Sequence, residues 1–173
     1  MRISIATPKS IVSLATAALA SLTLAGLPAQ AENAQAASTK PYEWSAQLVS
    51  YDAETHTAVL KARVASHVAI AGLDSYSEGD RLILTWSGRS WASGVRGLAR
   101  DPELTSDSLS LPVEFVAAEM DGRYVSFRIP VPDSSVELIS GMETGHRVTG
   151  TSPRMATDWN NSVSSLRHYN DVD

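Results

Sequence analysis

Apolar and polar residues alternate along two well-separated stretches of this chain. In residues 56–64, one face of the predicted strand carries Ala58, Leu60, Ala62 and Val64. In residues 124–131, one face carries Val125, Phe127, Ile129 and Val131. A period of two with charged residues on the opposite face is typical of a strand buried on one side. Turn residues precede each stretch, so the pattern predicts one β-hairpin over 44–64 and another over 112–131.

The residues after each hairpin also follow a common pattern. Apolar positions three residues apart, at 70, 73 and 76 and again at 136, 139 and 142, predict a short helix or helical turn. Gly79-Asp80 then precedes a predicted strand over 81–86, and Gly145-His146 precedes one over 147–151. Each half of the chain is therefore predicted to form a strand-strand-helix-strand unit.

A fixed offset relates the two halves. Adding 67 to the residue numbers carries the first alternating stretch onto the second, and adding 66 carries the positions after it onto their counterparts. One deletion between two matched blocks favours an internal duplication. The alternative is that any two units of this type look alike.

These patterns predict a mainly β fold, a small closed six-stranded barrel made of two duplicated strand-strand-helix-strand units. We expect a single domain over 42–173. Its predicted parts are repeat 1 at about 44–86, a connecting loop over 87–111, repeat 2 at about 112–151 and a C-terminal cap over 152–173. In this cap, the spacing of Met155, Trp159, Val163 and Leu166 predicts a short amphipathic helix with Asp158 or Thr157 at its N-cap.

The position of Gly79-Asp80, after a hairpin and a short helix and before a third strand, resembles the GD box of the cradle-loop barrels. That family comprises the double-psi and related six-stranded barrels. Gly145-His146 matches only the glycine of the motif. The resemblance spans roughly residues 44–151 and implies a six-stranded barrel; because the family has many functions, it implies no particular activity.

The first 31 residues have the order of a bacterial signal peptide. Arg2 and Lys9 precede an apolar segment over 11–27, and Ala29-Gln30-Ala31 supplies a small-x-small cleavage site. The apolar segment is too short and too rich in small residues for a membrane span, which needs about 20 strongly apolar residues. We therefore expect a signal peptide over 1–31, a flexible leader over 32–41 and a periplasmic or secreted protein with no stable membrane insertion after cleavage.

The charge and the cysteine content exclude several classes of function. The predicted signal peptide carries two of the 14 basic residues and none of the 19 acidic ones, so the mature net charge is 12 minus 19, or −7. An acidic protein is a poor non-specific binder of nucleic acid, which requires clustered lysine and arginine. The absence of cysteine excludes disulfides, thiolate metal sites and a cysteine nucleophile.

One segment concentrates aromatic and basic residues in this acidic chain. Its candidate ligand- or partner-binding residues are Trp86, Arg89, Trp91, Arg96 and Arg100. Tryptophan and arginine are enriched where proteins hold partners, and arginine binds carboxylate or phosphate with two donors. The alternative is structural, with Trp86 ending a core strand and Trp91 attaching the loop to the barrel.

Two other groups of residues have weaker chemical signals. Asp101, Glu103 and Asp107 lie close together in the connecting loop, as paired carboxylates do in glycoside hydrolases. Asp52, Glu54 and His56 occupy alternate positions along a predicted turn. They are either ligands of a metal ion or the solvent-exposed residues of a hairpin turn. The four histidines lack zinc-motif spacing, and no serine nucleophile motif is present.

We therefore expect a non-enzymatic ligand- or partner-binding module of the bacterial envelope. Its expected partner is an anionic or aromatic ligand or an envelope protein, with no nucleic acid, no metal and no cofactor. The alternative function is a small hydrolase of envelope polysaccharide that uses the loop carboxylates.

We predict that the mature protein begins at Glu32, or at Ala37 if the second small-x-small site Ala34-Gln35-Ala36 is cleaved. N-terminal sequencing of protein recovered from cell fractions measures the cleavage point. A cytoplasmic chain that begins at Met1 or Arg2 would contradict the prediction.

Overall fold

The computed structural model describes residues 40–65, 71–100, 108–119 and 123–169. The predicted signal peptide over 1–31 and nearly all of the predicted leader over 32–41 lie outside these ranges. The turn residues Asp121-Gly122 of the second predicted hairpin also lie outside them. The described part of the chain contains no helix that is long and apolar enough to cross a membrane.

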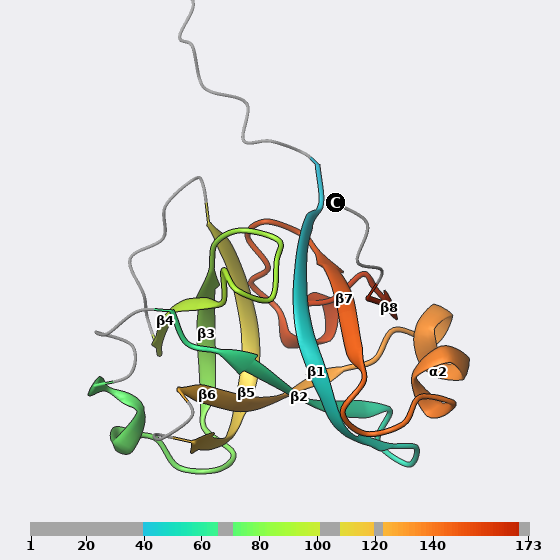
Figure 1. The fold of residues 1–173 in the computed structure, drawn as a ribbon, viewed down its shortest axis with the longest axis horizontal. Helices are drawn as coiled ribbons and strands as arrows, with labels where there is room; N and C mark the ends of the chain where they lie inside the picture. Colours follow the sequence, from blue (N-terminus) through green and yellow to red (C-terminus); the bar gives the residue numbers. More distant parts are fainter. Residues whose placement is uncertain (1–39, 66–70, 101–107, 120–122, 170–173) are drawn as a thin grey trace, which may run out of the picture. The chain divides into compact units, whose positions relative to one another are not determined.

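The described residues form one antiparallel sheet of eight strands, in the order β4-β3-β5-β6-β2-β1-β7-β8 (Figure 1). Its strands are β1 (Tyr42–Asp52), β2 (Thr57–Arg63), β3 (Arg81–Trp86), β4 (Val95–Ala99), β5 (Leu109–Glu119), β6 (Tyr124–Pro130), β7 (Arg147–Ser152) and β8 (Ser165–His168). The helical elements are α2 (Asp133–Ser140) and the 3-10 turns η1 (Leu73–Ser75) and η2 (Trp159–Asn161).

The mainly β class is confirmed, whereas the predicted count of six strands is wrong. β4 lies within the predicted connecting loop over 87–111, and β8 lies within the predicted cap. Both are edge strands in which buried residues are sparse, so neither shows the period-two pattern that identified the other strands. Among the described residues β4 and β8 do not pair with each other, so the sheet is not closed.

The predicted C-terminal amphipathic helix is also corrected by the structure. Residues 159–161 form only the single turn η2, and Leu166 belongs to β8. The predicted cap at Asp158 is present, because its side chain accepts a hydrogen bond from the Asn160 N–H at 3.2 Å. Backbone pairing of β8 with β7 decides the outcome at Leu166, which faces Gly150 across the ladder.

α2 occupies the position predicted from the spacing at 136, 139 and 142. It buries Ile139 completely and lies beside β8 (Figure 1). Its Ser135 hydroxyl accepts a hydrogen bond from the backbone N–H of Leu166 at 2.8 Å. The helix is thereby attached to the edge of the sheet.

The two predicted alternating strands, β2 and β6, pair with each other in the middle of the sheet. Leu60 lies opposite Phe127, and both side chains are 0 % exposed. The charged residues between the apolar positions face outward, as the pattern predicts. The centre of the core is thus formed by the two stretches with the strongest signal.

The strand pairings on either side of this centre have matching registers. Leu48 of β1 pairs with Leu60, and Phe115 of β5 pairs with Phe127. The register shifts directly after each of these pairs, between Leu48 and Ser50 in β1 and between Phe115 and Ala117 in β5. Adding 67 to the first pair of residue numbers gives the second pair.

Gly79 and Gly145 also occupy matching positions. Their φ angles are +91° and +94°, values that favour glycine because a Cβ would be strained there. The Gly79 N–H donates to the carbonyl of Phe115 at 2.9 Å, and the Gly145 N–H donates to the carbonyl of Leu48 at 2.8 Å. The two glycines therefore start β3 and β7 against the same point of the neighbouring strand.

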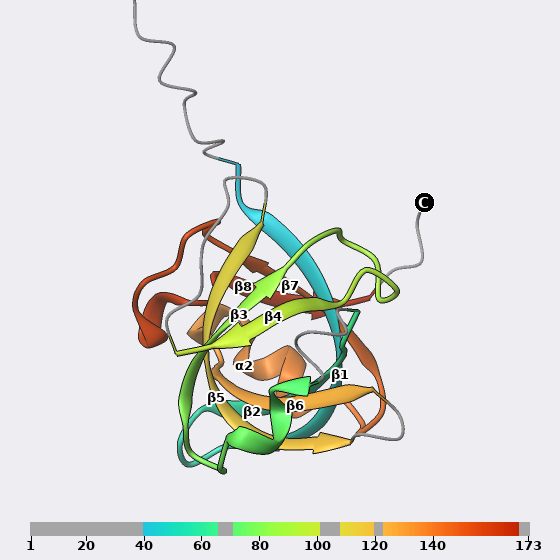
Figure 2. The same ribbon diagram turned by 90° about the vertical axis from the view of Figure 1, so that its left-hand side faces the viewer.

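The sheet curls far enough to bring β1 and β3 together, although three strands lie between them in the sheet order. Trp44 and Trp86 are both completely buried, and their ring centroids are 5.6 Å apart. β1 bends strongly along its length (Figure 2). Gly150 permits the close packing, since a Cβ there would lie 2.2 Å from the Trp44 ring.

Replacing Leu60 or Phe127 by alanine is expected to destabilise the protein by roughly 2–5 kcal/mol each, because each change leaves a cavity in the centre of the core. Chemical denaturation of the two variants measures the loss. Arg63→Ala is the control, because Arg63 is exposed on β2. A loss at Leu60 or Phe127 no larger than that of the control would contradict the central role of this pairing.

Candidate functional site

Three charged side chains form a row across β3, β5 and β6. Arg81 pairs in register with Glu114, and Glu114 pairs in register with Arg128. The Glu114 carboxylate lies between the two guanidinium groups, with Oε2 3.3 Å from Arg81 Nη2 and Oε1 bonded to Arg128 Nη1. The Glu114 side chain is only 16 % exposed, so this carboxylate is largely removed from water.

Trp159 lies over one end of this row. The Arg81 guanidinium carbon is 4.0 Å from the centroid of the Trp159 ring, which is a close cation–π contact. The turn that carries Trp159 is held by Asp158, whose second carboxylate oxygen accepts a hydrogen bond from the Asn161 side chain at 2.9 Å. Arg81 therefore contacts the ring, and Asp158 holds the turn that carries it.

Two hollows share Arg81 and Trp159 in their linings. The first, of about 380 Å³, is lined by Arg81, Leu82, Ile83, Arg100, Pro112, Val113, Thr157 and Trp159. The second, of about 300 Å³, is lined by Asp52, Thr55, Thr57, Arg81, Glu114, Arg128 and Trp159. We call the two hollows together the Trp159 groove. Their volumes fall in the lower part of the range of small-molecule sites.

Opposite charges balance in the second hollow, which contains two arginines and two carboxylates. Hydrogen bonds from the Thr55 hydroxyl and from the backbone N–H groups of Glu54 and Thr55 lower the pKa of Asp52, and the nearby charge of Arg128 lowers it further. Asp52 thus remains ionised well below neutral pH. The hollow combines an aromatic face with hydrogen-bonding groups of both signs.

The structure separates the five predicted binding residues from one another. Trp86 is 0 % exposed and packs in the core against Trp44, so a ligand cannot reach it. Its environment is the one described by the structural alternative, the end of a core strand. The other four residues lie on the surface or are partly buried.

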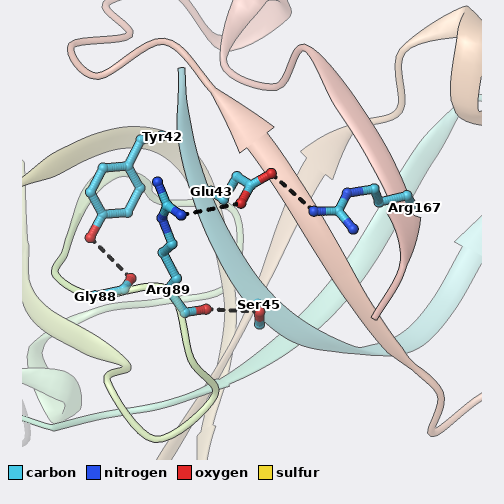
Figure 3. Close-up of polar contacts among 6 residues, drawn as sticks. All are labelled: Tyr42, Glu43, Ser45, Gly88, Arg89 and Arg167. Carbon is cyan, nitrogen blue, oxygen red and sulfur yellow. Dashed lines mark hydrogen bonds and ion pairs between the residues drawn. The ribbon is translucent and has the colours of Figure 1, made fainter. Parts of the chain in front are cut away.

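Arg89 lies on the loop between β3 and β4, which is attached to β1 by two hydrogen bonds (Figure 3). The Tyr42 hydroxyl donates to the Gly88 carbonyl at 3.0 Å, and the Ser45 hydroxyl donates to the Arg89 carbonyl at 2.9 Å. Burial raises the pKa of Tyr42.

The Arg89 side chain is 76 % exposed, and its guanidinium group lies 4.0 Å from the Glu43 carboxylate. This carboxylate is held more closely by Arg167, at 2.9 Å (Figure 3).

Arg96 and Arg100 have different surroundings. The Arg96 Nε donates to the Ser87 hydroxyl at 2.8 Å on the exposed edge strand β4. Arg100 pairs with Asp80 at 2.9 Å and lines the first hollow of the Trp159 groove. The pKa of Asp80 is lowered, mainly by a hydrogen bond from the Ser77 N–H and also by Arg100. Of the five predicted residues, Arg100 alone lines the groove.

Trp91 belongs to a second aromatic cluster. It stacks on Tyr124 with ring centroids 6.0 Å apart and planes inclined by 28°. Arg147 lies 5.3 Å from the Trp91 ring centroid and 5.5 Å from that of Tyr169. Trp91 therefore attaches its loop to the sheet, as the structural alternative proposes, and also presents part of its surface to solvent.

Of the remaining candidates, one group lies within the described residues and the other lies outside them. Asp52 Oδ1 accepts hydrogen bonds from the N–H groups of Glu54 and Thr55, which is the geometry of a hairpin turn. No group of three or more metal-ligating side chains occurs within the described residues. Asp101, Glu103 and Asp107, the carboxylates of the hydrolase alternative, lie outside the described residues.

Sequence reasoning missed the residues that build the groove. Arg81, Glu114, Arg128 and Trp159 are far apart in sequence, and strand pairing brings the first three into one row. The spacing around Trp159 predicts an amphipathic helix, whereas the structure has the single turn η2 there. The sequence does show a charged residue on the outward face of each of the three strands. These residues can be recognised as one row only when the order and register of the strands in the sheet are known.

Comparison of the chain with protein-family models, with curated proteins and with solved structures finds no match. The resemblance to the cradle-loop barrels therefore stays a prediction.

The double variant Arg89→Ala, Arg96→Ala is expected to change the free energy of unfolding by less than about 0.5 kcal/mol, because both side chains are exposed. Trp86→Ala is expected to cost roughly 3–5 kcal/mol, as core truncations of large aromatics do. Thermal and chemical denaturation compare the two variants. A clear loss of stability in the arginine double variant would show that these side chains clamp the loop to the sheet.

Proposed function

We propose that this chain is a non-enzymatic ligand-binding module exported to the periplasm or exterior of a bacterium. The observation that carries the proposal is the Trp159 groove, in which a fixed aromatic ring is flanked by two hollows lined with charged and polar side chains. Ligand sites commonly combine an apolar wall with a few converging polar groups. The order of residues 1–31 supports export.

A binding role fits the charged groups of the groove better than a catalytic role does. A general acid needs a carboxyl group whose pKa is raised toward neutrality. In the groove, the pKa of Asp52 is lowered, and Glu114 is occupied by two guanidinium groups. With its lowered pKa, Asp52 accepts hydrogen bonds from a ligand but is a poor proton donor.

The matching registers and glycine positions of the two halves support a second part of the proposal. We infer that the chain arose by duplication of a unit that contains four strands rather than three. β4 and β8 pair with β3 and β7 in the same way, since Leu84–Leu98 and Gly150–Leu166 occupy matching positions of the two ladders. Two copies of one unit provide two similar surfaces, and only differences between them can create a single groove.

Trp159→Ala is expected to weaken ligand binding in the groove at least roughly fivefold, because stacking against a tryptophan contributes on the order of 1 kcal/mol or more. The ligand set would contain simple phenols, N-acetylglucosamine oligomers, benzoate and inorganic phosphate, with binding followed by thermal shift and by NMR of the tryptophan indole groups.

Trp91→Ala is the matched control, because the other surface tryptophan is already stacked on Tyr124. Binding that is equally affected by both substitutions, or by neither, would contradict a ligand site in the Trp159 groove. The absence of binding by every member of the set would contradict the proposed function itself.

A further inference from the structure

Trp159 and Trp91 occupy matching positions in the two halves of the sheet. Each tryptophan lies four residues before a buried valine, Val163 in one half and Val95 in the other. An arginine at the start of a strand covers each ring: Arg81 lies 4.0 Å from the centroid of Trp159, and Arg147 lies 5.3 Å from that of Trp91.

The strands beneath the two tryptophans match as well. Arg147 pairs with Gln47, and Gln47 pairs with Lys61, in the same order as Arg81, Glu114 and Arg128 in the other half. The strands of the two surfaces therefore pair in the same register and carry different side chains.

The main difference concerns the place beside each tryptophan. Beside Trp91 this place is filled by the ring of Tyr124, which stacks on it with planes inclined by 28°. The position that matches Tyr124 is Thr57, because Tyr124 pairs with Glu119 as Thr57 pairs with Asp52. Thr57 is too small to reach the neighbouring tryptophan in this way, and the second hollow, of about 300 Å³, lies between Thr57 and Trp159.

We propose that the hollow between Thr57 and Trp159 binds a flat phenol-like ring, which stacks on Trp159 as the ring of Tyr124 stacks on Trp91. The inference rests on the proposed function and names the chemical class of the ligand. The side chains around the hollow suit such a ring. Lys61 Nζ lies 5.2 Å from the centroid of the Tyr124 ring, and Arg128 occupies the matching position beside the hollow.

The polar side chains of the hollow indicate which polar substituents the bound ligand ring carries. Asp52 and Glu114 are hydrogen-bond acceptors that can receive a phenol hydroxyl or an amide N–H. Two arginines offset these two carboxylates, so the hollow has no excess charge that would favour a strongly anionic ring. A free phenol and a tyrosyl side chain of a peptide share this chemistry.

The test measures binding of p-cresol and of N-acetyl-L-tyrosinamide to the full folded protein by NMR of the indole groups. We expect both probes to shift the Trp159 signal, with one equivalent bound. Tighter binding of the tyrosinamide would identify a peptide as the source of the ring, and equal binding would identify a free phenol. N-acetyl-L-leucinamide, which is apolar but not aromatic, is expected not to bind.

Two substitutions exchange the side chains at the matching positions 57 and 124. Thr57→Tyr supplies the ring from the chain itself and is expected to weaken p-cresol binding at least about tenfold, or about 1.4 kcal/mol, and to raise the melting temperature. Tyr124→Thr opens the matching place beside Trp91 and is expected to increase the number of bound p-cresol molecules from one to two. Ser50→Tyr adds the same ring at an exposed position of β1 outside the hollow and is the control.

The outcomes separate this inference from the proposed function. If N-acetylglucosamine oligomers or phosphate shift the Trp159 signal and p-cresol does not, the aromatic ligand is wrong and the groove remains a ligand site. If p-cresol binds equally well to the wild type and to Thr57→Tyr, the position of the ring is wrong. If no probe shifts the Trp159 signal, both proposals fail. Because Tyr124→Thr leaves the second hollow intact, it tests the inference even if Thr57→Tyr does not fold.

Discussion

The pairing of β2 with β6 is the constraint on which the rest of the sheet depends. These two strands occupy its centre, and Leu60 and Phe127 face each other there in complete burial. A one-residue slip of either strand would turn its apolar face outward and its charged residues inward. The neighbouring strands β1 and β5 add Leu48 and Phe115 to the same core layer, so the central register also fixes the positions of the hairpins on either side.

Curling of the sheet converts this layer into an enclosed core. The Trp44–Trp86 contact joins strands that are distant in the sheet order, and Gly150 provides the space that the Trp44 ring requires. On β3, β5 and β6, the face opposite the enclosed core carries the charged residues. The Trp159 groove is therefore a consequence of how the core is packed, because the row of Arg81, Glu114 and Arg128 depends on the register of these strands.

The two tryptophan surfaces illustrate how similar backbones acquire different properties. At one surface Tyr124 fills the place beside Trp91, and at the other Thr57 leaves a hollow beside Trp159. The difference between a large planar side chain and a small one is sufficient to distinguish a closed surface from an open one. On this interpretation, the filled surface shows which shape of group fits the open surface.

The amino-acid sequence by itself determined the mainly β class, the two alternating strands, the helix after the second hairpin and the burial of Leu60 and Phe127, because periodicity directly records which face of an element is buried. It did not determine β4 and β8, which are short edge strands held by pairing with neighbours rather than by their own pattern. The sequence also favoured Trp86 as a binding residue and did not single out Trp159. Composition within one segment cannot distinguish a core tryptophan from a surface one, and the partners of Trp159 come from strands that only the tertiary structure places side by side.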